Sequence, residues 1–147
     1  MNILNFSVAL VFFLQSNFAF ASCTQSSDAL GDQEEIRAVN SQLFELTFSD
    51  NVSGLKELLG NPKNTAKITS KGIAAALNSA MWDESTGSLK VLLEHPCCEL
   101  CDIKKTYSIA DQFFWGQTET KSLIKAKIIG LGGKDPDEPS DDDNSTC

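Results

Sequence analysis

The side chains with the richest chemistry in this chain lie in one short run, His95-Pro96-Cys97-Cys98-Glu99-Leu100-Cys101. Thiolates and an imidazole are common zinc ligands, so one interpretation is a metal site. A second is a thiol-redox pair, because Cys98 and Cys101 have the two-residue spacing that favours a low thiol pKa. No second cysteine pair completes a zinc site, and no strand pattern precedes the run as in most redox motifs. We therefore expect neither a bound metal nor another cofactor.

The compartment of the chain decides how its five cysteines are interpreted, and the N-terminus indicates export. Residues 3–21 have the pattern of a secretory signal. The apolar run at 8–14 is too short to span a bilayer, and Ala19-Phe20-Ala21 is a small-x-small cleavage site. No Lys or Arg precedes the run, so an uncleaved membrane anchor is the alternative. We expect a secreted or periplasmic (extracytoplasmic) protein.

Disulfide bonds are the default state of cysteines in an exported chain. The candidates are Cys97, Cys98, Cys101 and Cys147. Cys97 or Cys98 pairs with Cys101, or one of these three pairs with Cys147, and the sequence leaves the connectivity open. The odd cysteine is Cys23. Its context, Phe20-Ala21-Ser22-Cys23, resembles a bacterial lipobox, which makes it a lipidation candidate that would tether the chain to a membrane.

Other candidate sites carry weaker signals. His95 is the sole histidine, and its place beside a helix-ending proline predicts a residue that interacts with the helix dipole. Asn51 and Asn144 begin glycosylation sequons. Trp82 and Trp115 are candidate contact residues, because aromatic side chains dominate interface energetics. No pattern predicts a catalytic site, so we expect no enzymatic activity.

The net charge of the chain is −8, which argues against nucleic acid and anionic membranes as partners. The C-terminal segment from Lys134 to Cys147 holds six acids and one lysine. Such a composition cannot bury enough apolar surface to fold, so a disordered acidic tail is expected over 131–147.

The elements that position these residues are predicted by an internal repeat. Ser88-Leu89-Lys90-Val91-Leu92-Leu93-Glu94-His95-Pro96 has a near-copy upstream, Gly54-Leu55-Lys56-Glu57-Leu58-Leu59-Gly60-Asn61-Pro62, and the offset from Gly54 to Ser88 defines the period. A further step of the same length reaches Ser122-Leu123-Ile124-Lys125 in a more divergent third unit. A fixed period of this size indicates stacked helical units. Apolar spacing predicts helices from about 34 to 48 and over 53–59, 71–82, 88–94 and 123–129, with polar connection at 63–69.

The helix pair resembles the ankyrin repeat. Ala74-Ala75-Ala76-Leu77-Asn78-Ser79-Ala80 stands where ankyrin units carry their first helix, and Gly87-Ser88-Leu89-Lys90-Val91-Leu92-Leu93 where they carry the second. The resemblance covers roughly residues 34–130, but the Thr-Pro-Leu-His motif is absent and the period is slightly longer than the usual one. It implies a short all-α stack of about three units with poor β-hairpins. It also implies protein binding through the concave, loop-bearing face.

The predicted organisation is a signal peptide (1–21), a flexible lead-in (22–33), an ankyrin-like repeat domain (34–130) and the acidic tail (131–147). The predicted function is protein–protein binding by an exported module. The alternatives are a small exported redox or metal-binding protein that uses Cys97, Cys98 and Cys101, and an envelope protein anchored by lipid at Cys23. The binding partner and the oligomeric state stay open.

Overall fold

In the computed structural model, residues 33–113 and 118–138 are described, and these ranges contain helices and no strand. The helices are α1 (Gln33–Phe48), α2 (Val52–Gly60), α3 (Pro62–Thr65), α4 (Ser70–Trp82), α5 (Thr86–Leu93), α6 (Leu100–Phe113) and α7 (Glu119–Gly130). The predicted all-α fold class is confirmed for this part of the chain. The predicted signal segment, Cys23, Trp115, Asn144 and Cys147 lie outside the described residues.

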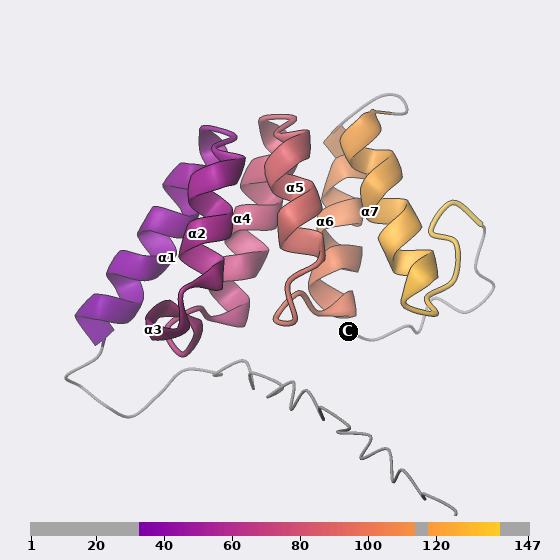
Figure 1. Cartoon of the computed structure of the whole chain (residues 1–147). Coiled ribbons are helices and arrows are strands. Elements are labelled where there is room, and N and C mark those ends of the chain that lie inside the picture. Colours follow the sequence, from indigo (N-terminus) through magenta and orange to yellow (C-terminus); the bar gives the residue numbers. More distant parts are fainter. Residues whose placement is uncertain (1–32, 114–117, 139–147) are drawn as a thin grey trace, which may run out of the picture.

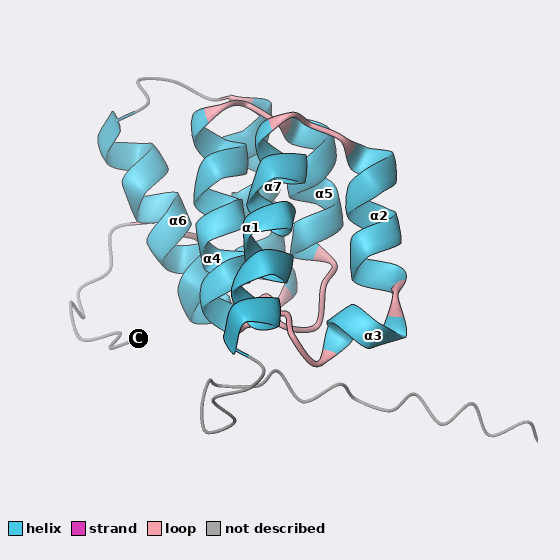
Figure 2. Cartoon of the chain, turned by 90° about the vertical axis from the view of Figure 1, so that its left-hand side faces the viewer, coloured by secondary structure: helices cyan, strands magenta, loops and turns pink. Residues whose placement is uncertain are grey.

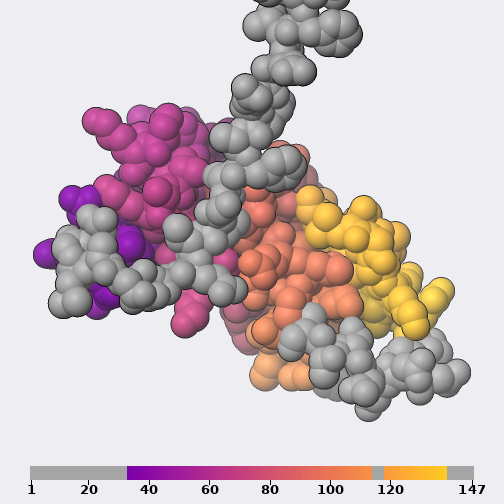
Figure 3. Space-filling model, turned by 90° about the horizontal axis from the view of Figure 1, so that it is seen from below, coloured from indigo at the N-terminus to yellow at the C-terminus, as the bar shows by residue number. Residues whose placement is uncertain are grey.

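The helices form two layers. One layer holds α1, α4 and α6 side by side, and the other holds α2, α5 and α7 (Figure 1, Figure 2). The two helices of each pair, α1 with α2, α4 with α5 and α6 with α7, run in opposite directions and pack together (Figure 1). Seen from below, the units follow one another across the molecule in sequence order (Figure 3). Each pair therefore buries its apolar faces mainly against its neighbours.

Most helix boundaries follow the predictions. The bounds of α2, α4 and α5 lie close to the expected positions. α4 starts after Thr69, whose hydroxyl accepts the N–H of Gly72 at 3.0 Å as an N-cap. α7 begins one turn earlier than expected, because Thr118 caps it by accepting the N–H of Lys121 at 3.2 Å.

Two further features differ from the expectation. The short helix α3 lies at the start of the connection that was predicted to be irregular. Its N-cap is Asn61, whose side chain accepts the N–H of Lys63 at 3.0 Å, and Pro62 fits the first helical turn. α6 starts at Leu100, so the last two residues of the cysteine-rich run belong to a helix that the apolar spacing did not place.

The repeat period is present in the backbone of the turns that follow α1 and α4. Asp50 and Glu84, which lie one period apart, both adopt left-handed conformations with φ of 47° and 52°. The N–H of Asn51 donates to the carbonyl of Leu46 at 2.9 Å, and the N–H of Ser85 donates to that of Ala80 at 2.8 Å. Each donor and acceptor is again one period from its counterpart. The third N-cap, Thr118, comes just short of a full period after Ser85, which places the slip of the repeat in the third unit.

The core reproduces the repeat as well. Leu43 and Leu77 are fully buried at equivalent places in α1 and α4, and Leu55 and Leu89 are fully buried in α2 and α5. Burying one such leucine stabilises the fold by about 1.5–3 kcal/mol. Ile68, in the connection before α4, is also fully buried and was missed, because an isolated apolar residue gives no periodic signal.

A polar link joins the first unit to the second. The side chain of Asn40 in α1 donates to the carbonyl oxygen of Lys67 at 2.9 Å and accepts the N–H of Thr69 at 3.3 Å. Gly72 lies directly against it, because a Cβ added there would overlap the Asn40 Oδ1 atom. The lack of a side chain at Gly72 therefore lets α1 approach the start of α4.

The expected tail has a different structure in its first part. After Gly132, which has a φ of 82°, residues 133–138 return along α7. The Lys125 ammonium lies 2.8 Å from an Asp135 carboxylate oxygen and 2.7 Å from one of Asp137. The Tyr107 hydroxyl in α6 donates to Asp137. The prediction of a wholly solvated tail is thus wrong for 131–138, because neither Lys125 nor Tyr107 is near this segment in sequence; 139–147 lies outside the described residues.

Candidate interaction site

The cysteine-rich run contains two free thiols, Cys98 and Cys101. None of the expected pairings of Cys97 or Cys98 with Cys101 is therefore formed. Cys98 is buried, and desolvation raises the pKa of its thiol to about 12, a shift that Lys127 opposes and Asp102 reinforces. A redox cysteine requires the opposite shift, because the thiolate is the nucleophile. Cys97 is 1% exposed and is not one of the free thiols.

His95 lies in the loop that follows α5. α5 ends at Leu93 with Glu94 as its C-cap. The Nδ1 atom of His95 accepts the N–H of Cys97 at 3.2 Å, and partial burial lowers the pKa of the imidazole, which favours the neutral ring. Within residues 33–113 and 118–138, His, Cys, Asp and Glu side chains form no group of three or more that could hold a metal ion.

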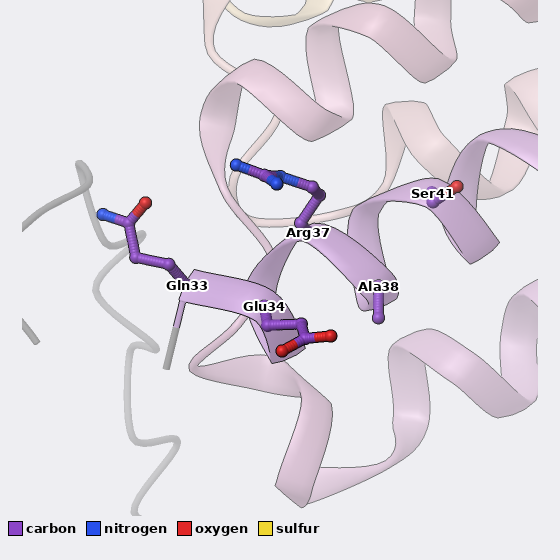
Figure 4. Close-up of a pocket in the computed structure, with 5 residues that line it drawn as sticks. All are labelled: Gln33, Glu34, Arg37, Ala38 and Ser41. Carbon is purple, nitrogen blue, oxygen red and sulfur yellow. The ribbon is translucent and has the colours of Figure 1, made fainter. Parts of the chain in front are cut away.

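A hollow on the molecular surface lies along the first half of α1. Among the described residues, its lining consists of Gln33, Glu34, Arg37, Ala38 and Ser41, which come from this one helix (Figure 4). Ligand pockets bury most of the ligand surface, and these five residues on one flank of α1 do not surround a small molecule. The sequon residue Asn51 serves as the N-cap of α2, and its side-chain oxygen accepts the N–H of Gly54 at 3.0 Å.

Exposed aromatic side chains lie along one edge of the stack, where α1, α4 and α6 end. Phe48, Trp82 and Phe113 are the last residues of α1, α4 and α6, and their exposed fractions are 60%, 50% and 59%. The rings of Trp82 and Phe113 pack with centroids 5.4 Å apart and planes tilted by 47°. Phe44, one turn before Phe48 on the same side of α1, is 44% exposed. We call these four residues the aromatic edge.

The direction of the helices explains why these rings lie along the same edge of the stack. α1, α4 and α6 run parallel within one layer, so their C-termini meet beside the short turns at the top of Figure 1. Trp82 was a predicted contact residue, and the structure places it in the middle helix of this layer. Phe44 and Phe48 were not singled out from the sequence, although Phe48 and Trp82 align one period apart and gave a usable signal.

None of the described helices is both long and apolar enough to cross a membrane. Searches of protein-family models, curated proteins and solved structures return no match to this chain.

Proposed function

We propose that this chain is an exported protein-binding module, an ankyrin-like stack of helix pairs whose contact surface is the aromatic edge. The observation that carries the proposal is that α1, α4 and α6 each end in an aromatic side chain at least half exposed to solvent. Single exposed apolar residues are ordinary on protein surfaces, but aligned aromatic residues are typical of interfaces.

The aromatic edge is pre-organised for binding. Its side chains stand on helices whose other faces are buried in the core, so binding would order little of the backbone. Aromatic rings bring large contact area with few rotatable bonds. Covering the exposed part of one such side chain contributes on the order of 1 kcal/mol to binding. The aromatic edge therefore supplies part of the binding free energy, and further contacts with the partner supply the rest.

The redox alternative is less well supported than binding. At neutral pH a thiol whose pKa is near 12 is almost wholly protonated, so Cys98 would be a poor nucleophile. For Cys97 we propose a disulfide to a cysteine outside the described residues, Cys147 or Cys23, which agrees with export. Intact mass of the naturally exported chain, with peptide mapping before and after reduction, would identify this bond and the loss of residues 1–21.

Binding through the aromatic edge is tested by comparing what co-purifies with three forms of the chain. The first is unaltered, the second carries Trp82→Ser, and the third carries Ile129→Ser as a matched control. Ile129 is 46% exposed on α7, which ends at the edge of the stack opposite the aromatic edge. We expect a stoichiometric partner with the unaltered and control chains and its loss with Trp82→Ser. The proposal would be contradicted if all three forms retained the partner equally, or if no partner co-purified with any of them.

A further inference from the structure

We infer that the partner of the aromatic edge presents a basic, extended segment, rich in Arg and Lys; this inference rests on the proposed function. Charge around the edge supports it. Five exposed acids lie in the last turns of α1, α4 and α6 or in the turns that follow them: Glu45, Asp50, Asp83, Glu84 and Asp111.

Basic residues do not neutralise this end of the layer. Neither α1, α4 nor α6 has a basic residue in its last turn. The basic residues of these helices are Arg37, Lys71, Lys104 and Lys105. All four lie in the first half of their helices and so toward the opposite edge of the stack. Lys121 is close to the edge, but its side chain is only 8% exposed and lies 2.6 Å from Asp111. The exposed charge beside the aromatic edge is therefore negative.

Aromatic faces and carboxylates attract the same kind of group. A guanidinium or ammonium binds the face of an aromatic ring, with Trp the strongest, and forms ion pairs with nearby carboxylates. The protein already contains this arrangement next to the edge. The Lys121 ammonium lies 5.3 Å from the centroid of the Tyr107 ring while it pairs with Asp111. A partner with Arg or Lys beside apolar residues could repeat that geometry at Trp82 and Phe48.

The length of the edge sets the length of the extended segment. Helices packed in one layer are about 8–10 Å apart, so three helix ends span roughly 20 Å. An extended chain covers this distance with about six residues, at roughly 3.3 Å each. Negative potential along the edge would also speed the encounter with a positive segment and make binding weaken with salt.

The test is a selection of random 12-residue peptides, displayed on phage, against the immobilised full chain. Enriched peptides are synthesised with a fluorophore, and their affinities are measured by polarisation in 50 mM and 500 mM NaCl. We expect enriched peptides of net positive charge that bind at least tenfold more weakly in the higher salt. Asp83→Lys should weaken binding at least fivefold, and Asp83→Asn should weaken it less. Glu57→Lys, an exposed change on α2 in the other layer, should leave binding unchanged.

The outcomes separate this inference from the proposed function. Enriched peptides that are neutral or acidic, and that Trp82→Ser no longer binds, would overturn the basic partner and leave binding at the aromatic edge intact. Basic peptides that bind equally well to Trp82→Ser would overturn both, as would a selection with no enrichment over a blank surface. Circular dichroism of each variant establishes that it is folded, and the two substitutions at Asp83 keep the test decisive if one of them does not fold.

Discussion

Replacing Gly72 with alanine should weaken the packing of the first unit against the second. The new Cβ would occupy the position of Asn40 Oδ1, and it would also lie 3.3 Å from the Asn40 Cβ atom. Asn40 cannot swing away freely, because its side chain is held by the Lys67 carbonyl oxygen and the Thr69 N–H. Either the side chain gives up these bonds or α1 moves away from the start of α4.

The size of the effect follows from those bonds. Two partly buried hydrogen bonds contribute about 0.5–1.5 kcal/mol each, and leaving their partners unsatisfied adds to the loss. Alanine gains up to about 1 kcal/mol over glycine in a helix. The expected net change is a destabilisation of about 1–3 kcal/mol, measured as the free energy of unfolding in urea.

Two further variants make the explanation specific. Gly60→Ala is the matched control: a Cβ there meets no atom within 4 Å, so the same propensity gain should appear without the penalty. In an Asn40→Ala background the obstructing oxygen is gone, so adding Gly72→Ala should be neutral or stabilising. The reasoning is refuted if Gly72→Ala behaves like Gly60→Ala, or if its penalty is the same with and without Asn40.

Three other predictions follow from single contacts. Leu89→Ala empties a fully buried site in α5 and should lower the free energy of unfolding by about 2–5 kcal/mol in urea; a change under about 1 kcal/mol would mean the site collapses or is not core. Burial raises the pKa of Cys98 to about 12, so iodoacetamide at pH 8 should modify it at least tenfold more slowly in the native chain than in guanidinium, as read from its peptide by mass spectrometry; equal rates would contradict its burial. The ion pairs with Lys125 hold the pKa values of Asp135 and Asp137 below their usual range. The attachment of 133–138 to α7 should therefore persist above the ordinary carboxyl pKa near 4 and be lost as pH falls through the lowered values. Backbone amide NMR shifts of this segment at pH 6 and pH 2 measure this loss, and Asp137→Asn should weaken the attachment to α7 already at pH 6.

Helix positions were predictable because they depend on local spacing. Leu55, Leu58 and Leu59 recur at helical intervals, and their counterparts after one period do the same, so α2 and α5 could be placed from the chain alone. The C-cap of α2 is Asn61, which also caps the start of α3, and this double role gives no signal in the helical spacing. The left-handed turn residues Asp50 and Glu84 were not anticipated, because neither is a glycine.

The candidate site was less predictable, because it depends on contacts between distant segments. Trp82 could be singled out by residue type, but its neighbour Phe113 comes from α6, where the period has slipped. The same holds for the acids, which come together only because three helices end on one side of the stack. The free state of Cys98 and Cys101 also depends on packing, since the interval between two cysteines does not say whether the thiols can meet.

The link at Asn40 means that the units of this stack are not interchangeable. One period after Asn40 the chain has Ala74, and one period after Gly72 it has Thr106. The second and third units are joined instead by the Thr106 hydroxyl, which donates to Asn78 Oδ1 at 3.0 Å, and the counterpart of Asn78 in the first unit is Phe44. Duplicating or reordering a unit would therefore bring together faces that lack their matching groups. Unlike arrays of consensus repeats, this chain would not tolerate lengthening by simple copying.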